Sequence, residues 1–73
     1  MEARELREMT TEELRAKLDE SYERLMNFRF QLYIKQLKDH NLLRRTKRDI
    51  ARLKTVLRER ELAQMAEEEE RAE

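Results

Sequence analysis

Most of the side chains that could bind an anion lie in one stretch of the sequence. Residues 35–60 carry ten Lys or Arg residues and three Asp or Glu residues, a net charge of +7. The whole chain has 17 residues of each kind and is formally neutral, because residues 1–34 sum to −2 and residues 61–73 to −5. Charge that is segregated in this way acts locally on partners, so the basic segment predicts a surface that binds a polyanion.

Helical periodicity would place these cations on one side of a helix, opposite its apolar face. Ala51 and Thr55 lie at the centre of this side, and both are small. Small residues flanked by long cations let a phosphate backbone approach closely, while Arg offers bidentate donors to phosphate. We call the cations of this surface the basic arc: Arg44, Lys47, Arg48, Arg52, Lys54 and Arg58, with Arg45 at its edge. A charged helix face that is merely solvated is the alternative.

A basic arc with few aromatic residues suits double-stranded RNA. Proteins read such RNA mainly through shape, phosphates and 2′-hydroxyls, whereas sequence-specific binding of single strands normally uses stacked rings. The chain has two Phe and two Tyr. We expect Phe28 to pack in the core, and we expect Phe30 and Tyr33 to contact a protein rather than a base.

The sequence contains few residues in patterns that are typical of catalysis. His40 is the single histidine and stands beside Asp39 in a polar turn, where a helix cap or a phosphate contact is expected rather than general-base catalysis. The sequence has no Gly-rich phosphate loop and no Cys, and the run of Glu67–Glu70 suits a solvated tail better than a divalent-ion site. We therefore predict a protein that is not an enzyme and that uses no cofactor and no metal.

The elements that carry these residues are predicted to be helices, so the fold class is all-α. The chain has no Gly and no Pro and is rich in Glu, Leu, Arg, Lys, Met and Ala. Thr10 and Glu13 have the spacing of a capping box, and Met9 and Leu14 suit a hydrophobic staple. A long helix is therefore expected over residues 10–37, after a possible short helical turn at residues 2–8.

A second long helix is expected over residues 42–62. The polar residues 38–41 separate it from the first helix, and Asp39 or Asn41 can serve as its N-cap. Because this connection is short, the two helices should form an antiparallel hairpin. We expect residues 1–62 to form one RNA-binding helical-hairpin domain and residues 63–73 to form an acidic tail that frays into solvent.

Apolar residues at three- and four-residue spacing give each helix a face for the other. In the first helix this face comprises Leu14, Leu18, Ser21, Leu25, Phe28 and Leu32. In the second it comprises Leu43, Thr46, Ile50, Leu53 and Leu57, with Leu42 and Val56 at its margin. A further apolar stripe on the first helix, here called the outer stripe, comprises Met26, Phe30, Tyr33, Ile34 and Leu37. One neighbouring helix buries only one face, so the outer stripe predicts a partner protein or self-association.

The size of the chain also points to a partner. With 73 residues, of which 38% are hydrophobic and 47% charged, the chain buries a small core and should be marginally stable alone. A partner that binds only the folded state would add stability. The apolar stretches are too short to span a membrane, and the start, residues 1–5, lacks the character of a signal or transit peptide. The expected location is the cytoplasm.

Three motifs together are characteristic of one family. They are Phe28-Arg29-Phe30-Gln31, then Gln36-Leu37, and then the run from Lys47 to Arg60, which contains Asp-Ile-Ala-Arg-Leu-Lys-Thr. In order and spacing, about residues 3–60 resemble the bacterial large-subunit ribosomal protein 29 family. Members of that family usually have a Gly just before the Gln-Leu pair, where this chain has Lys35. The first helix is therefore expected to run on, and the turn to differ.

The resemblance implies a structural constituent of the large ribosomal subunit. It implies a small helical hairpin that binds large-subunit ribosomal RNA near the exit of the nascent-peptide tunnel, beside another ribosomal protein. It adds Arg29, Gln31 and Gln36 to the residues expected to face RNA, together with the basic arc and Thr55.

The alternative function is a coiled-coil module for protein–protein interaction without RNA binding, since the composition also suits that class. The heptad pattern is kept only briefly, because Ser21 interrupts it and Lys35 ends it. Binding of the second helix to a membrane surface is not expected, because that helix has no Trp or Phe to anchor it.

Overall fold

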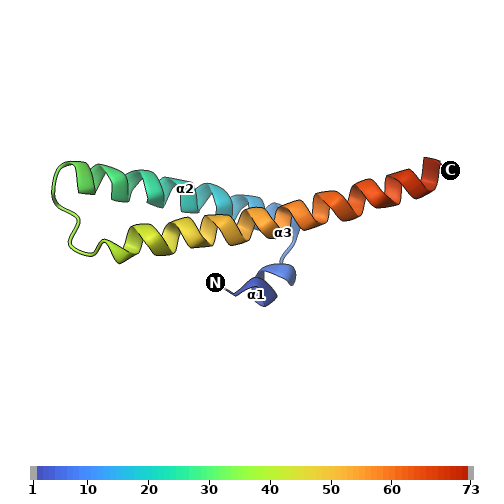
Figure 1. Cartoon of the computed structure of the whole chain (residues 1–73), viewed down its shortest axis with the longest axis horizontal. Coiled ribbons are helices and arrows are strands. Elements are labelled where there is room, and N and C mark those ends of the chain that lie inside the picture. Colours follow the sequence, from blue (N-terminus) through green and yellow to red (C-terminus); the bar gives the residue numbers. More distant parts are fainter. Residues whose placement is uncertain (1, 73) are drawn as a thin grey trace.

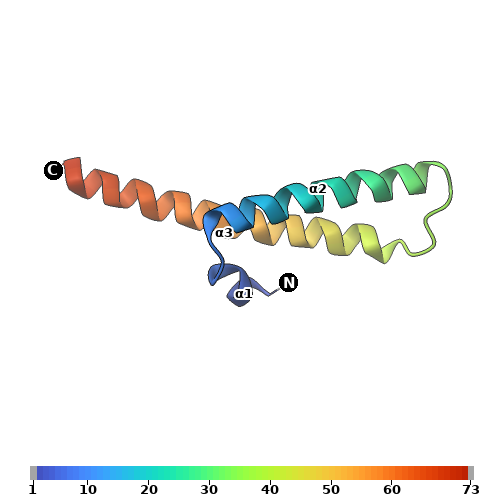
Figure 2. The ribbon, with the colours of Figure 1, turned by 180° about the vertical axis from the view of Figure 1, so that it is seen from behind.

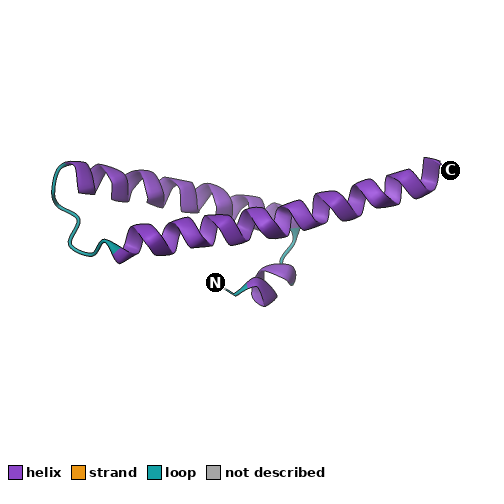
Figure 3. Ribbon diagram, viewed as in Figure 1, coloured by secondary structure: helices purple, strands orange, loops and turns teal. Residues whose placement is uncertain are grey.

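The computed structural model describes residues 2–72, which form three helices: α1 (Ala3–Arg7), α2 (Thr11–Tyr33) and α3 (Asn41–Ala72). Helices α2 and α3 lie side by side and antiparallel, joined by residues 34–40, and α1 packs against α3 (Figure 1). The described residues contain helices and loops but no strand (Figure 3). The predicted all-α hairpin is confirmed. Met1 and Glu73, the ends of the predicted domain and tail, lie outside the described residues.

Helix α2 begins where the capping pattern predicted. The Thr10 side-chain oxygen accepts a hydrogen bond from the backbone N–H of Glu13 at 3.1 Å, which satisfies one of the free donors of the first turn. Met9 packs against the cluster that contains Leu14, as a hydrophobic staple requires. The cap and the staple together fix the direction in which the chain enters α2.

Helix α2 ends at Tyr33, so the prediction that it continues to residue 37 was wrong. Lys35 has a φ of 61° and occupies the left-handed region that favours glycine. The N–H of Gln36 donates to the carbonyl of Gln31 at 2.7 Å, and the N–H of Lys35 donates to that of Leu32 at 3.0 Å. This pair of bonds is a Schellman motif with Lys35 at its left-handed position. The motif forms even without glycine, and it ends the helix.

The core between α2 and α3 follows the predicted apolar faces over most of their length. Ser21 and Thr46 are also buried there, and the Thr46 hydroxyl donates to the carbonyl of Leu42 at 2.8 Å. Leu32 departs from the prediction, because it is 40% exposed in the last turn of α2, at the turn end of the hairpin. The buried apolar side chains that α2 and α3 contribute are Leu14, Leu25, Ile50, Leu53 and Val56.

Helix α1 completes this core from a third side. Leu6 is almost fully buried and clusters with Leu14, Leu53 and Val56. Val56 was predicted at the margin of the apolar face, yet it is only 2% exposed. It is buried because α1 covers the side of α3 that α2 does not reach. The possible helical turn near the N-terminus is thus a real element with a packing role.

Arg60 holds α1 in place through the chain that follows it. Its guanidinium donates to the carbonyls of Arg7 and Met9 and, at 3.1 Å, to the hydroxyl of Thr11. Carbonyls at the end of a helix have no partner within the helix, and a cation there also suits the helix dipole. One side chain of α3 therefore joins the end of α1 to the start of α2.

Helix α3 continues through Ala72, so both its predicted end at residue 62 and the predicted fraying of the tail were wrong. Beyond the hairpin it projects as a single helix (Figure 2). Every described side chain from Glu61 onward is exposed. The molecule is therefore elongated, with principal extents of 57 × 20 × 16 Å. The projection is helical because an already nucleated helix propagates through good helix formers that contain no Gly or Pro. We call residues 61–72 the extension.

Candidate nucleic-acid interface

The basic arc lies on a single element, helix α3. All seven of its cations are exposed, from Arg44 near the start of the helix to Arg58 four turns later. Ala51 and Thr55, which the sequence placed at the centre of this surface, are exposed as well. The buried residues of α3 lie on its other side, so packing fixes the helix in an orientation that leaves these cations in solvent.

On one side the basic arc borders α2. The Lys54 ammonium lies 5.4 Å from the centre of the Tyr22 ring, within the range of a cation–π interaction. Arg29 follows Tyr22 by seven residues, about two helical turns, and therefore lies on the same side of α2. The cationic surface thus extends from α3 toward α2 at this border, and it includes the Arg that the family resemblance added.

On its other side the basic arc borders α1, which sequence reasoning did not foresee. Between α1 and α3 lies a hollow, here called the α1–α3 hollow, which is lined by Ala3, Arg7, Ala51, Arg52, Thr55 and Val56. Ala51 and Thr55 therefore form part of a recess with a helix on one flank, rather than the middle of an open surface. The one signal for this in the sequence is Leu6, a lone apolar residue in a polar segment.

Glu61 and Glu59 each pair with a cation at or beside the basic arc. Glu61 accepts from Arg58 at 2.7 Å within α3, and Glu59 accepts from Arg7 of α1 at 3.3 Å. All four side chains are about half exposed or more, and exposed pairs of this kind contribute about 0 to 1 kcal/mol. Phosphates can therefore compete for these two Arg residues without a large loss of folding stability.

The two predicted Gln residues lie together at the turn rather than on the basic arc. Gln31 belongs to the last turn of α2 and is half-buried, whereas Gln36 follows the helix end and is exposed. The backbone bond between them is part of the Schellman motif, so the turn itself brings them together. The residues that the sequence predicts to face RNA thus lie in three places. The basic arc and Thr55 lie along α3, Arg29 lies on the neighbouring side of α2, and Gln31 and Gln36 lie at the turn.

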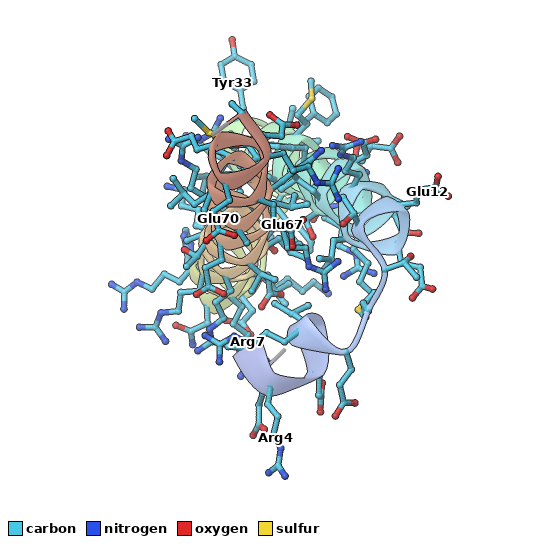
Figure 4. All side chains as sticks on the ribbon, turned by 90° about the vertical axis from the view of Figure 1, so that its right-hand side faces the viewer. Arg4, Arg7, Glu12, Tyr33, Glu67 and Glu70 are labelled. Carbon is cyan, nitrogen blue, oxygen red and sulfur yellow. The ribbon has the colours of Figure 1, made fainter. Side chains whose placement is uncertain are left out.

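The outer stripe is exposed, as predicted, over most of its length. Phe30 is 62% exposed and Tyr33 is 85% exposed, Met26 and Ile34 are exposed too, and Leu37 is half-buried in the turn. Viewed along the hairpin, Tyr33 projects on the side opposite α1 (Figure 4). The outer stripe and the α1–α3 hollow therefore face different directions, so separate partners could occupy them together.

Within residues 2–72 there is no group of three His, Cys, Asp or Glu side chains that could hold a metal ion. Over the same range, no helix has the length and apolar character needed to cross a membrane. The hairpin fold and its exposed cationic and apolar surfaces define a small helical protein suited to binding through its outer faces.

Comparison with known proteins identifies the family. The sequence profile of the family described as Ribosomal L29 protein matches residues 4–60. This chain belongs to that family. The match includes α1, α2 and the hairpin part of α3, and it stops before the extension.

Individual relatives agree with the profile. The chain is 58% identical over 62 residues to the large ribosomal subunit protein uL29 of Thermotoga maritima, and 56% identical over 62 residues to that of Thermosipho melanesiensis. Each of these alignments covers 85% of this chain and 94% of the relative. The uL29 of Moorella thermoacetica is 52% identical over 64 residues, which cover 88% of this chain and 96% of the relative. Because the family consists of ribosomal proteins, the prediction that the chain is not an enzyme is confirmed.

Proposed function

We propose that this protein, a structural constituent of the large ribosomal subunit, binds large-subunit ribosomal RNA through the basic arc. The observation that carries the proposal is the set of seven exposed cations on the outward side of α3, within the matched region. The place of action is then the ribosome in the cytoplasm. A position beside the exit of the nascent-peptide tunnel rests on family resemblance alone.

Electrostatics supply the mechanism of binding. Lys and Arg that contact phosphates release condensed counterions, so affinity falls as salt rises. Arg44 and Arg48 are one helical turn apart and can follow one strand of a phosphate backbone with bidentate hydrogen bonds. The rigid hairpin presents these cations in a fixed order, which favours RNA of matching shape over other polyanions.

The outer stripe is proposed to contact a neighbouring ribosomal protein. Phe30 and Tyr33 are large, exposed side chains on the side away from α1, and aromatic residues of this kind commonly anchor protein interfaces. With Met26, Ile34 and Leu37 they form a short apolar surface at the turn end of the hairpin. The neighbour would bury it when the subunit assembles.

The alternative, a coiled-coil module without RNA binding, has less support in this structure. The apolar faces of α2 and α3 are already buried against each other and α1, so they are closed to a second helix. The outer stripe is confined to the end of α2 and the turn, which is too short for a coiled coil of several heptads.

Charge reversal on the basic arc tests the proposal. In the double variant Arg44→Glu, Arg48→Glu we expect normal helicity, because both side chains are exposed and Glu is a good helix former. We also expect the variant to be lost from large subunits that are sedimented from cells or reconstituted in vitro. The matched control is Arg15→Glu, Arg24→Glu, which makes the same change in net charge on exposed positions of α2 and should still co-sediment.

Retention of the Arg44, Arg48 variant at the level of the control would contradict RNA binding by the basic arc. Equal loss of both variants would show that total charge, rather than this surface, governs association. Circular dichroism of each variant measures its helicity and so shows whether a loss of binding is caused by unfolding.

A further inference from the structure

We infer that the α1–α3 hollow is the seat of one unpaired nucleotide of the large-subunit RNA, with its base on the floor of the hollow and its phosphate at the rim. This inference rests on the proposed function, since it specifies how RNA is held at the α1 border of the basic arc. Its ligand differs from the phosphate backbone proposed for the rest of the arc. Three parts of the hollow support the inference: its floor of Ala3, Ala51 and Val56, its rim of Arg7 and Arg52, and its wall, which is helix α1.

The floor of the hollow is apolar. Val56 is buried beneath it, and Ala3 and Ala51 contribute methyl groups. The hydroxyl of Thr55 donates to the carbonyl of Ala51 at 2.8 Å, which satisfies that donor within the helix. The hollow is shallow, since Ala51 and Thr55 are exposed, and its floor offers a phosphate no free donor. The flat face of a base, by contrast, can cover the methyl groups at little loss of hydration. The floor therefore selects a base rather than a phosphate.

The rim of the hollow is cationic. Arg7 stands on its α1 side and Arg52 on its α3 side. Glu59 accepts from Nε and Nη2 of Arg7 at 3.4 and 3.3 Å, and these bonds leave the donors of Nη1 for another acceptor. Arg7 lies where α1 faces α3, whereas Arg4 points away from the hairpin (Figure 4). Guanidinium groups bind phosphates and also stack on bases, so this rim complements both parts of a nucleotide.

The wall of the hollow is held in place before any ligand arrives. Leu6 anchors α1 in the core, and Arg60 binds the carbonyls of Arg7 and Met9 at its end. Arg7 is further oriented by its pair with Glu59. A recess that is already formed loses little conformational entropy on binding, which favours a specific occupant.

The occupant must be unpaired, because paired bases hide their faces within the stack. RNA offers an open base face only at loops, bulges and ends, and proteins commonly bind such bases when they are splayed out. The rest of the basic arc lies along the same helix, so the nucleotide could leave a duplex whose phosphates are bound by Arg44 and Arg48.

Filling the hollow tests the inference. Ala51→Leu and Ala3→Leu occupy it from opposite sides while keeping every charge, and Leu is a good helix former. The control, Ala16→Leu, makes the same change at an exposed position of α2. Each full-length protein is reconstituted into large subunits that lack it. Chemical probing then reports the reactivity of unpaired bases in the ribosomal RNA, and titration with that RNA gives the affinity.

We expect wild type and Ala16→Leu to protect the same unpaired base, and both filling variants to leave it reactive. Loss of the base contact should weaken binding about tenfold. The dependence on salt should change by no more than the loss of the one phosphate held at the rim, which is a change of about 1 in the slope of log K against log salt. Protection of the same bases and equal affinity in both filling variants would overturn this inference and leave the proposed function standing. Absence of any RNA binding by the wild type would overturn both.

Discussion

At the scale of single residues, Lys35 decides where helix α2 ends. It takes the left-handed position of the Schellman motif, a position that favours glycine, and a Cβ in that conformation costs about 1 to 2 kcal/mol. The backbone bonds of Lys35 and Gln36 offset this cost. The end of the helix is therefore set by backbone hydrogen bonding in spite of the residue type.

Lys35→Gly should stabilise the protein. Glycine removes the Cβ strain but adds about 0.4 to 1 kcal/mol of entropy to the unfolded chain, so we expect a net gain of about 0.5 to 1 kcal/mol. The control Lys38→Gly removes the same charge in the same turn from a residue without positive φ, and it should be destabilising. Urea unfolding followed by circular dichroism compares the two. Equal effects of both substitutions would show that charge in the turn, not the backbone conformation, matters.

Arg60 is the residue whose role is least visible in the sequence, where it reads as one more cation of the basic segment. Arg60→Ala removes three hydrogen bonds that join α1 and the start of α2 to α3. We expect a loss of about 1 to 3 kcal/mol in the free energy of unfolding, and faster hydrogen exchange at the N–H of Leu6. Arg58→Ala is the control, since its pair with Glu61 is exposed and should contribute less than about 1 kcal/mol. Slow exchange at Leu6 in Arg60→Ala would contradict the role of Arg60.

At the scale of elements, the hairpin could be predicted because its signals are redundant. Leu14, Ile50 and Leu53 recur at helical spacing, and Thr10 and Glu13 mark a start that the structure confirms. The docking of α1 could not be predicted, because it depends on a single apolar residue, Leu6, and on a tertiary bond from Arg60. Periodicity carries no signal over so short an element.

Two predictions of helix length were wrong, those for the ends of α2 and α3. The end of α2 was missed because a Schellman motif is normally recognised by its glycine, and Lys35 stands in that place. The extension differs from the prediction because a run of charge such as Glu67–Glu70 does not stop a helix that contains no Gly or Pro. The basic arc and the outer stripe were both identified from wheel angles, since exposure follows from periodicity once the buried face is known. The α1–α3 hollow could not be predicted in this way, because it forms only where α1 docks on α3.

The extension should contribute little to the stability of the hairpin. Its described side chains from Glu61 to Ala72 are all exposed, and acidic residues near a helix C-terminus oppose the dipole. A chain ending at Leu62 should therefore unfold within about 0.5 kcal/mol of the full chain, while its total helical signal falls. Thermal unfolding followed by circular dichroism measures both. A loss of more than about 1 kcal/mol would show that the extension packs against the hairpin.

At the scale of the whole molecule, charge and shape are arranged along one axis. The basic arc occupies the hairpin part of α3, and the extension, where Glu67 and Glu70 are seen end-on in Figure 4, continues the same helix outward. A straight helix keeps its own end away from its middle, so the extension meets the basic arc at its near end, where Glu61 pairs with Arg58, and projects away from the rest of the arc. The formal net charge of zero thus combines a cationic hairpin surface with an acidic projection, and each can meet a different environment.

Opposite sides of the hairpin are proposed to bind different partners, RNA on one side and a protein on the other. The proposed RNA surface runs from α3 to the α1–α3 hollow, and the outer stripe lies on the side away from α1. A chain of 73 residues has a small core, so partners on two sides would add stability that the core alone does not supply. The elongated hairpin exposes both surfaces without any change of fold.

The dependence of RNA affinity on salt is the most direct measure of phosphate binding by the basic arc, because the number of phosphates bound sets the size of this dependence. If most of the seven cations contact phosphates, the slope of log K against log salt should lie between about −4 and −6 for the wild type. Arg44→Ala, Arg48→Ala should reduce its magnitude by about 2, whereas Arg15→Ala, Arg24→Ala should leave it unchanged. A slope near zero, or an equal change in both variants, would show that the basic arc does not bind phosphates.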